Sequence, residues 1–178
     1  PLPMSDEGCA RAEPLFGEVL AMRTRLGHPY FSRATAAFNL ASIAVSRRQV
    51  ELAQARLIEA ADLAERTESR YLGQVLVDEV SSLAALSGHF ETAVCLLAAS
   101  AQLRAAIQIP LHELGLEQAN DIQRARLALG PAATSAAEQA GRAMTFEQTL
   151  AAARGWLRRT PLHSVPGAPP FTASGARH

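Results

Sequence analysis

The sequence predicts an all-α protein, an α-α superhelix of helical hairpins, and its composition and periodicity carry that prediction. Of the 178 residues, 36 are alanine and 23 are leucine, which are both strong helix formers. Residues 30–109 contain no proline, so several helices can follow one another there without a break. Apolar residues recur at helical spacing in this stretch, and no run of β-branched residues alternates with a period of two for long enough to form a strand.

The helices are predicted to repeat with a period of about 40 residues, within the range typical of helical repeats. Shifting residues 39–66 by 40 positions pairs small residues with small ones and bulky residues with bulky ones: Leu40 with Val80, Ala44 with Ala84, Val50 with Phe90, Ala53 with Ala93 and Leu57 with Leu97. Small residues at equivalent positions of successive repeats let two helices approach closely, and the bulky residues beside them fill the remaining space between the helices. A shift of 41 carries Ala12, Phe16 and Met22 onto Ala53, Leu57 and Leu63. We therefore expect residues 15–23 to be the second helix of an earlier hairpin.

Local residues predict where individual helices begin and end. Gly88 is placed for a left-handed turn between two helices, whereas the equivalent turn at residues 46–49 lacks a glycine. Gly130 followed by Pro131 predicts a helix stop and then a helix start. Pro14 would kink a helix entering at residue 9, so we expect the first robust turn to begin near residues 13–14.

Three regions follow from these signals. Residues 1–110 are predicted to hold the helical repeats and residues 111–154 the C-terminal capping helices, where Thr145 and Gln148 fit a capping box. Residues 155–178 contain three glycines and four prolines, so we interpret them as a tail. The tail is expected to be anchored on the helices through its first apolar residues, Trp156 and Leu157.

The columns of bulky and small residues resemble the hairpin pattern of tetratricopeptide repeats. The period is longer than that family's usual period of about 34 residues, and it resembles the longer-helix variety found in MalT-like bacterial regulators. The segment 141–151, G-R-A-M-T-F-E-Q-T-L-A, is similar to the segment that closes the helical array in LuxR- or SARP-type ATPase regulators. The resemblance covers residues 8–154. It implies the C-terminal region of a large bacterial transcriptional regulator, and because the chain begins on Pro1 rather than methionine we expect a longer parent protein.

A search for chemistry yields no catalytic, cofactor-binding or metal-binding constellation. All 17 basic residues are arginine, so a phosphate-binding loop of the Gly-x-x-x-x-Gly-Lys type is excluded. His112 and Glu113 begin like a zinc-protease helix, but position 116 is leucine and the second ligand is absent. Cys9 and Cys95 are interpreted as buried reduced thiols, with a disulfide between them as the alternative. We therefore expect no enzyme, no cofactor and no metal.

Charge balance argues against contact with nucleic acid or with an acidic membrane. The 17 basic residues are matched by 17 acidic ones, and no basic field surrounds the two arginine pairs at 47–48 and 158–159. The carboxylate pairs at 78–79 and at 59 and 62 are interpreted as exposed or groove-lining helix charges. The sequence shows no signal peptide and no apolar stretch long enough to span a membrane, so we expect a cytoplasmic protein.

The candidate binding site is a groove. In stacked hairpins the first helix of each unit lines the concave face, and its outward positions are free of packing duty. The repeat columns put these residues on that face: Thr35, Phe38, Ser42 and Val45 in one hairpin, and Val75, Asp78, Ser82 and Ala85 in the next. Phe38 differs most from its counterpart, Asp78. Either Phe38 packs against the preceding helix or a neighbouring molecule, or it is a binding hot spot.

These observations predict a non-catalytic repeat domain for protein–protein interaction or effector sensing. The resemblance implies that its partners include the upstream NTPase and DNA-binding domains of a parent chain, with signals passed through the stacking of the repeats. The alternative is a freestanding tetratricopeptide-like adaptor that binds a peptide or a helix, with a homodimer as one arrangement.

Overall fold

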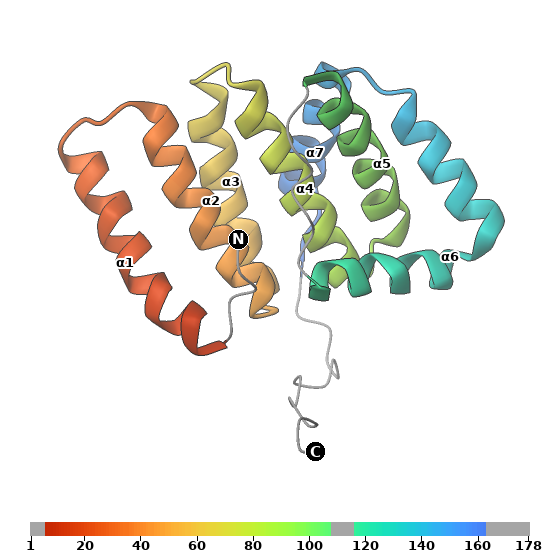
Figure 1. Cartoon of the computed structure of the whole chain (residues 1–178), viewed down its shortest axis with the longest axis horizontal. Coiled ribbons are helices and arrows are strands. Elements are labelled where there is room, and N and C mark those ends of the chain that lie inside the picture. Colours follow the sequence, from red (N-terminus) through yellow and green to blue (C-terminus); the bar gives the residue numbers. More distant parts are fainter. Residues whose placement is uncertain (1–5, 108–115, 163–178) are drawn as a thin grey trace.

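The computed structural model describes residues 6–107 and 116–162, and every regular element in these ranges is an α-helix (Figure 1). The predicted all-α class is therefore confirmed. None of these helices is long and apolar enough to cross a membrane. In chain order the helices are α1 (Asp6–Arg25), α2 (Tyr30–Ser46), α3 (Val50–Glu65), α4 (Arg70–Leu86), α5 (Phe90–Ile107), α6 (Leu116–Arg142) and α7 (Phe146–Arg159).

The helices follow one another with a constant spacing. Helices α2 to α5 begin at residues 30, 50, 70 and 90, so α4 follows α2, and α5 follows α3, at the offset expected from the sequence. From α1 to α6 each helix packs against the next along the chain, and α2 also contacts α4, as α4 contacts α6. Figure 1 shows the resulting superhelical stack, which runs from α1 at one edge to α6 at the other.

Three of the turns between α1 and α5 share one backbone hydrogen bond, and the turn between α3 and α4 differs, because there the Ser69 amide donates to the Thr67 hydroxyl at 3.2 Å. Only two of the four turns contain glycine at the left-handed position. The amide of Gln49 donates to the Ala44 carbonyl at 2.9 Å, and the amide of His89 donates to the Ala84 carbonyl at 2.8 Å. The predicted left-handed turn at Gly88 is therefore confirmed, and the turn without a glycine follows the same path. A left-handed residue stands in each turn: Gly27 (φ 66°), Arg48 (φ 57°), Glu68 (φ 51°) and Gly88 (φ 82°).

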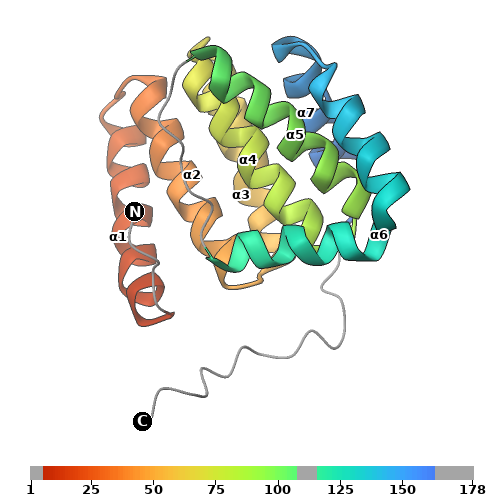
Figure 2. The ribbon, with the colours of Figure 1, turned by 45° about the vertical axis from the view of Figure 1, so that its right-hand side comes forward.

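Helix α6 is broken where the sequence predicted a stop and a start. Gly130 has φ 76° and ψ 169°, a conformation that is essentially restricted to glycine. Pro131 then begins the second half, at a position where a missing amide hydrogen does little harm. Figure 2 shows that the two halves run in different directions: the first crosses the lower end of the stack, and the second rises along α5.

Helix α7 returns over the stack and packs against α3, α4 and α5. Its start is the predicted capping box, because the Gln148 amide donates to Thr145 Oγ1 at 3.2 Å and the Thr145 amide donates to Gln148 Oε1 at 2.9 Å. Its end is held by Gln54 of α3, whose Nε2 donates to the carbonyls of Leu157 and Thr160, each at 2.7 Å. Leu157 itself is buried, as its predicted role as an anchor requires.

Two predicted boundaries are wrong. The tail was expected to begin at residue 155, but α7 continues through Arg159, since the burial of Leu157 and the Arg158–Asp62 ion pair outweigh the cost of about 1 kcal/mol for glycine in a helix. The first helix was expected to begin near residue 13, but α1 begins at residue 6 and contains Pro14. Burial of Cys9 one turn earlier favours the longer helix despite the hydrogen bond that Pro14 cannot donate.

Small residues line the closest helix contacts. Ala53 of α3 and Ala93 of α5 are fully buried at equivalent positions of the repeat. The tightest contact lies between α5 and α6, where an added Cβ on Gly141 would stand 2.1 Å from the carbonyl oxygen of Cys95. A backbone carbonyl cannot move aside as a flexible side chain can, so this position accepts glycine alone.

We expect Gly141→Ala to lower the free energy of unfolding by at least about 2 kcal/mol, because the added methyl group overpacks a rigid contact. The matched control is Gly17→Ala on α1, where an added Cβ meets nothing within 4 Å. That change should raise stability by about 0.5–1 kcal/mol, the usual gain on replacing glycine inside a helix. Urea denaturation followed by circular dichroism measures both values, and equal effects at the two positions would contradict the packing.

Candidate binding sites

The predicted groove is not an open one. Phe38, Val45, Asp78 and Ser82 are all buried, and Phe38 belongs to the main hydrophobic core with only 4% of its surface exposed. Of the remaining residues, Ala85 is also buried, and Thr35, Ser42 and Val75 are partly buried. The prediction that these side chains do not pack against the rest of the protein is therefore wrong for the buried ones. The first interpretation of Phe38, as a packing residue, is the one that its burial supports.

Asp78 is the centre of a buried polar network that joins α4 to α5. Its carboxylate accepts a hydrogen bond from Gln74 Nε2 at 3.0 Å and another from the Ser100 hydroxyl. The guanidinium of Arg104 stands 3.3 Å away, with 8% of its side chain exposed. The Ser82 hydroxyl donates to the backbone carbonyl of Asp78 at 3.1 Å. Asp78 is thus a structural ion-pair partner, and its interpretation as an exposed or groove-lining charge is wrong.

Removal of the Asp78 carboxylate should be costly, because it leaves Arg104 buried without this counter-ion. We expect Asp78→Ala to destabilise the fold by about 3–5 kcal/mol. Asp78→Asn, which keeps hydrogen-bonding capacity and loses the charge, should fall between Asp78→Ala and the unchanged protein. The control is Asp62→Ala, since the Asp62–Arg158 pair is more than half exposed and should contribute less than about 1 kcal/mol. Chemical denaturation of the variants tests the ranking.

Glu79 is the second unusual carboxyl group. Burial raises its pKa from 4.5 to about 7, a hydrogen bond from Ser42 lowers it in part, and the charge of Asp78 raises it further. The Ser42 hydroxyl lies 2.7 Å from Oε1 and ties α2 to α4. The other oxygen, Oε2, is buried and has no hydrogen-bond partner in the described parts of the chain. This environment favours the neutral acid near neutral pH.

Stability should therefore depend on pH through Glu79. Its folded pKa lies above its unfolded value of 4.5, so the folded state binds more protons in this window, and stability falls as pH rises from 4.5 to about 7. The total loss is expected to be about 3 kcal/mol at most. Glu79→Gln, which cannot titrate, should lack this component. Urea denaturation of both proteins between pH 4.5 and 8 tests it, and a constant difference between them would contradict the assignment.

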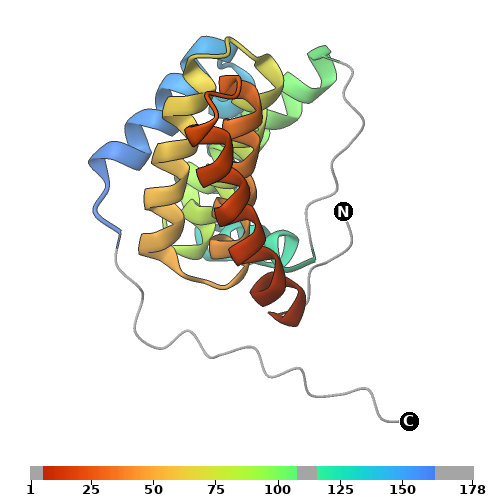
Figure 3. The same ribbon diagram turned by 90° about the vertical axis from the view of Figure 1, so that its left-hand side faces the viewer.

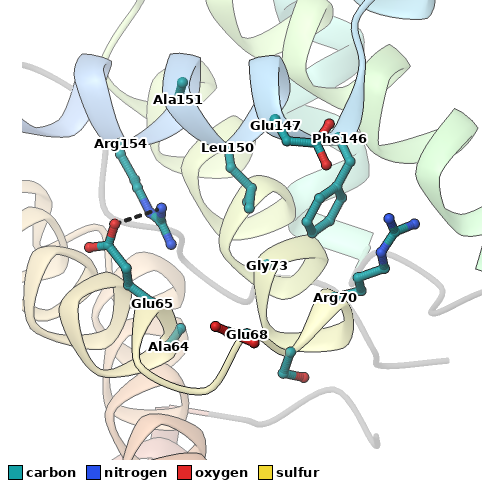
Figure 4. A pocket seen from close by; sticks show the side chains of 11 residues that line it. Ala64, Glu65, Glu68, Arg70, Gly73, Phe146, Glu147, Leu150, Ala151 and Arg154 are labelled. Carbon is teal, nitrogen blue, oxygen red and sulfur yellow. Dashed lines mark hydrogen bonds and ion pairs between the residues drawn. The ribbon is translucent and has the colours of Figure 1, made fainter.

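One hollow lies where α7 crosses the α3–α4 turn (Figure 4). Its volume is about 400 Å³. Phe146 and Leu150 of α7 form apolar walls over Gly73 of α4, where an added Cβ would stand 2.8 Å from the Phe146 ring. Alanines 64 and 151 complete the apolar lining. The absence of a side chain at position 73 therefore allows α7 to lie close to α4 at this site.

Charged groups surround this pocket, which we call the α7 pocket. Arg154 is paired with Glu65 at 3.2 Å, and the guanidinium of Arg70 lies 5.2 Å from the centre of the Phe146 ring. Two carboxylates remain, Glu68 and Glu147, and neither has an ion-pair or hydrogen-bond partner within residues 6–107 and 116–162. Figure 4 shows them on opposite sides of Gly73 and Leu150. The lining thus holds three carboxylates, those of Glu65, Glu68 and Glu147, against the two guanidinium groups of Arg70 and Arg154, so an apolar interior is combined with a small excess of negative charge.

A smaller hollow of about 270 Å³ lies between α5 and α6. Arg126 and Arg142 face it, and both pair with Glu138, at 3.1 and 3.3 Å. Arg104 also lines it while pairing with Asp78. Three guanidinium groups therefore share two carboxylates, which leaves this hollow with excess positive charge.

The remaining candidates from the sequence have structural roles where they are described. Cys9 and Cys95 are free thiols, so the alternative of a disulfide is wrong. Burial and the neighbouring charge of Glu91 raise the pKa of the Cys95 thiol, which makes it a poorer nucleophile. His112 and Glu113 lie outside the described residues. The other charges of interest are taken up in ion pairs: Arg47 with Glu13, Arg48 with Asp121, Arg56 with Glu59, and Arg158 with Asp62.

Within the described ranges, no group of three or more histidine, cysteine, aspartate or glutamate side chains is placed to hold a metal ion. Sequence reasoning missed the α7 pocket altogether. One signal was present, because an isolated glycine at position 73, inside a long helical pattern, indicates a close approach of another segment. It could not indicate that the segment is α7, which begins only at Phe146 and is separated from Gly73 by most of three helices.

Comparison with models of known protein families gave no match, and neither the curated proteins nor the solved structures contain a chain that matches this one.

Proposed function

We propose that this chain is a non-catalytic helical-repeat module that binds a protein or peptide partner through the α7 pocket. The observation that carries the proposal is the combination found there: an apolar interior between α4 and α7, and a lining in which three carboxylates outnumber the two guanidinium groups of Arg70 and Arg154. Binding pockets are commonly lined by apolar groups with a few charged groups that fix orientation.

The chemistry of the pocket favours a basic side chain of the partner. Arginine and lysine carry an apolar stem and a cationic end, so the stem can lie against Phe146 and Leu150 while the charge approaches a carboxylate at the rim. The pair formed by Arg154 and Glu65 closes one side, and Arg70, which lies over the Phe146 ring, is the pocket's own cation that an incoming basic side chain has to displace or avoid. A partner segment with one exposed basic anchor therefore fits better than a neutral or an acidic one.

The wider role that we propose is that of the C-terminal regulatory part of a larger bacterial transcription regulator. This step is supported by the sequence resemblance over residues 8–154. The α7 pocket is compatible with it, since α7 contacts both hairpins, and a ligand bound there can favour one stacking arrangement of α3, α4 and α5 over another. The freestanding adaptor remains the alternative, with the same pocket and the same partner chemistry.

A small anionic effector is a second candidate. The observation that favours it is the hollow between α5 and α6, where Arg104, Arg126 and Arg142 share two carboxylates. An anion bound to the folded state alone would raise the melting temperature, by an amount that grows with the logarithm of its concentration relative to its dissociation constant. Melting curves in phosphate and citrate, at constant ionic strength, test this candidate separately from the α7 pocket.

A peptide array tests the pocket. Peptides with a single arginine or lysine in an apolar context should bind, and their norleucine counterparts should bind at least about tenfold more weakly, as the loss of one charged hydrogen bond implies. The double variant Glu68→Gln and Glu147→Gln should reduce affinity by a similar factor. Fluorescence anisotropy at two salt concentrations measures the binding, which should weaken as salt rises.

The control is Glu59→Gln, because Glu59 is an exposed carboxylate of α3 outside the pocket. It should leave binding unchanged. All these substitutions lie at exposed positions, so melting temperatures should change little. Binding that is indifferent to the basic residue of the peptide, or that survives the double substitution, would show that the pocket is not the binding site.

A further inference from the structure

Helix α1 lies at one edge of the stack (Figure 3). It carries a stripe of exposed apolar side chains. Leu15 and Met22 share one face of α1, and Leu26 follows them in the turn directly after the helix, where its amide donates to the Met22 carbonyl at 2.9 Å. The exposed fractions of these three side chains are 61%, 46% and 62%. Val19 lies between them, is partly buried and packs against the main core. Exposed apolar side chains gathered in this way mark contact surfaces.

The repeat columns show what normally covers this face. Met22 of α1 corresponds to Leu63 of α3 and to Leu103 of α5. The side chain at this repeat position is exposed in α1, partly buried in α3 and only 9% exposed in α5. Val19 corresponds to Ala60 and Ser100, which are both fully buried. In α3 and α5 a preceding helix, α2 or α4, packs closely against the helix. Helix α1 has the same register and makes its close contact with α2, the helix that follows it, so within residues 6–107 and 116–162 no preceding helix packs on this stripe.

We infer that this stripe is the interface at which two copies of the chain associate, with the two α1 helices antiparallel across a twofold axis. The stripe is self-complementary, because residues 15, 19, 22 and 26 are spaced by four, three and four positions and read the same in both directions. Antiparallel pairing places Leu15 opposite Leu26 of the second copy, and Val19 opposite Met22. A twofold interface requires this reciprocity, since each contact occurs twice.

Charges beside the stripe support the same arrangement. Glu18 and Arg25 are both exposed and lie on one flank of the stripe, two helical turns apart. Neither has an ion-pair partner in the parts of the chain that the structure describes. Antiparallel pairing brings Glu18 of one copy within reach of Arg25 of the other, and the twofold axis repeats the pair. This charge complementarity favours a second copy over an unrelated helix.

The dimer should be weak. Helix α1 contains 20 residues and is about 30 Å long, so one helix face supplies most of the contact. Interfaces below about 1,200 Å² form transient complexes. We therefore expect a dissociation constant on the order of 10 µM. The α7 pocket is lined by residues of α3, α4 and α7 and of the turn between α3 and α4, so this inference does not depend on partner binding in that pocket. In a longer parent chain, an earlier helix of the same hairpin would occupy the stripe in place of the second copy.

Sedimentation velocity of the 178-residue protein tests the inference over about 1 to 300 µM, a range that brackets the expected dissociation constant. The protein should shift from monomer to dimer across the range. Met22→Glu should leave it monomeric throughout. The control, Leu127→Glu, changes a side chain of α6 that is 74% exposed, and it should dimerise like the unchanged protein. A monomer at the highest concentration, or equal behaviour of the two variants, would overturn the inference.

Charge exchange tests the antiparallel register. Glu18→Arg and Arg25→Glu should each weaken the dimer at least about tenfold, since each places like charges opposite one another twice. The double variant with both changes should recover the affinity of the unchanged protein. Helicity and melting temperature should stay the same in all variants, because both positions are exposed. Failure of the double variant to recover dimerisation would overturn the proposed register.

Discussion

The structure depends on the close approach of neighbouring helices, which small side chains permit. Ala53, Ala60 and Ala93 are fully buried where one helix meets another, and Gly141 lies directly against the backbone of α5. Close contacts of this kind align the helices but bury little apolar surface per residue. Polar contacts also join these helices: the Ser81 hydroxyl of α4 donates to the Ala93 carbonyl of α5 at 2.8 Å, and the Asp78 network connects the same two helices.

The same constraint creates the candidate binding site. Glycine at position 73 brings α7 against α4, and the capping box at Thr145 fixes where α7 begins. Phe146 then faces the α3–α4 turn, and Glu68 projects from that turn in a left-handed conformation. Because the pocket is formed by the contact between α7 and α4, a shift of α7 on α4 would change the shape of the pocket. Under the proposed function, a partner held there would bias the packing of α7 on the two hairpins, with no hinge loop required.

Local and periodic features could be predicted from the sequence, because they depend on neighbouring residues. The break at Gly130 and the cap at Thr145 each follow from a few adjacent side chains, and the repeat period follows from residues that recur about 40 positions apart. The left-handed conformation of Arg48 could not be predicted, since it costs about 1–2 kcal/mol without glycine. The repeated hydrogen bonds of the turn and the ion pair with Asp121, which lies far along the chain, hold it in place.

The groove assignment was wrong for the same reason that the pocket was missed: both depend on contacts between distant segments. The position of a residue within the repeat predicts which face of its helix the residue occupies. It does not predict whether another helix covers that face. The faces of Phe38 and Asp78 are covered, whereas the stripe of α1 is open. The open edge and the α7 pocket use different helices, so two associated copies would present two pockets at once. A partner with two basic anchors would then bind with an avidity that neither copy provides alone.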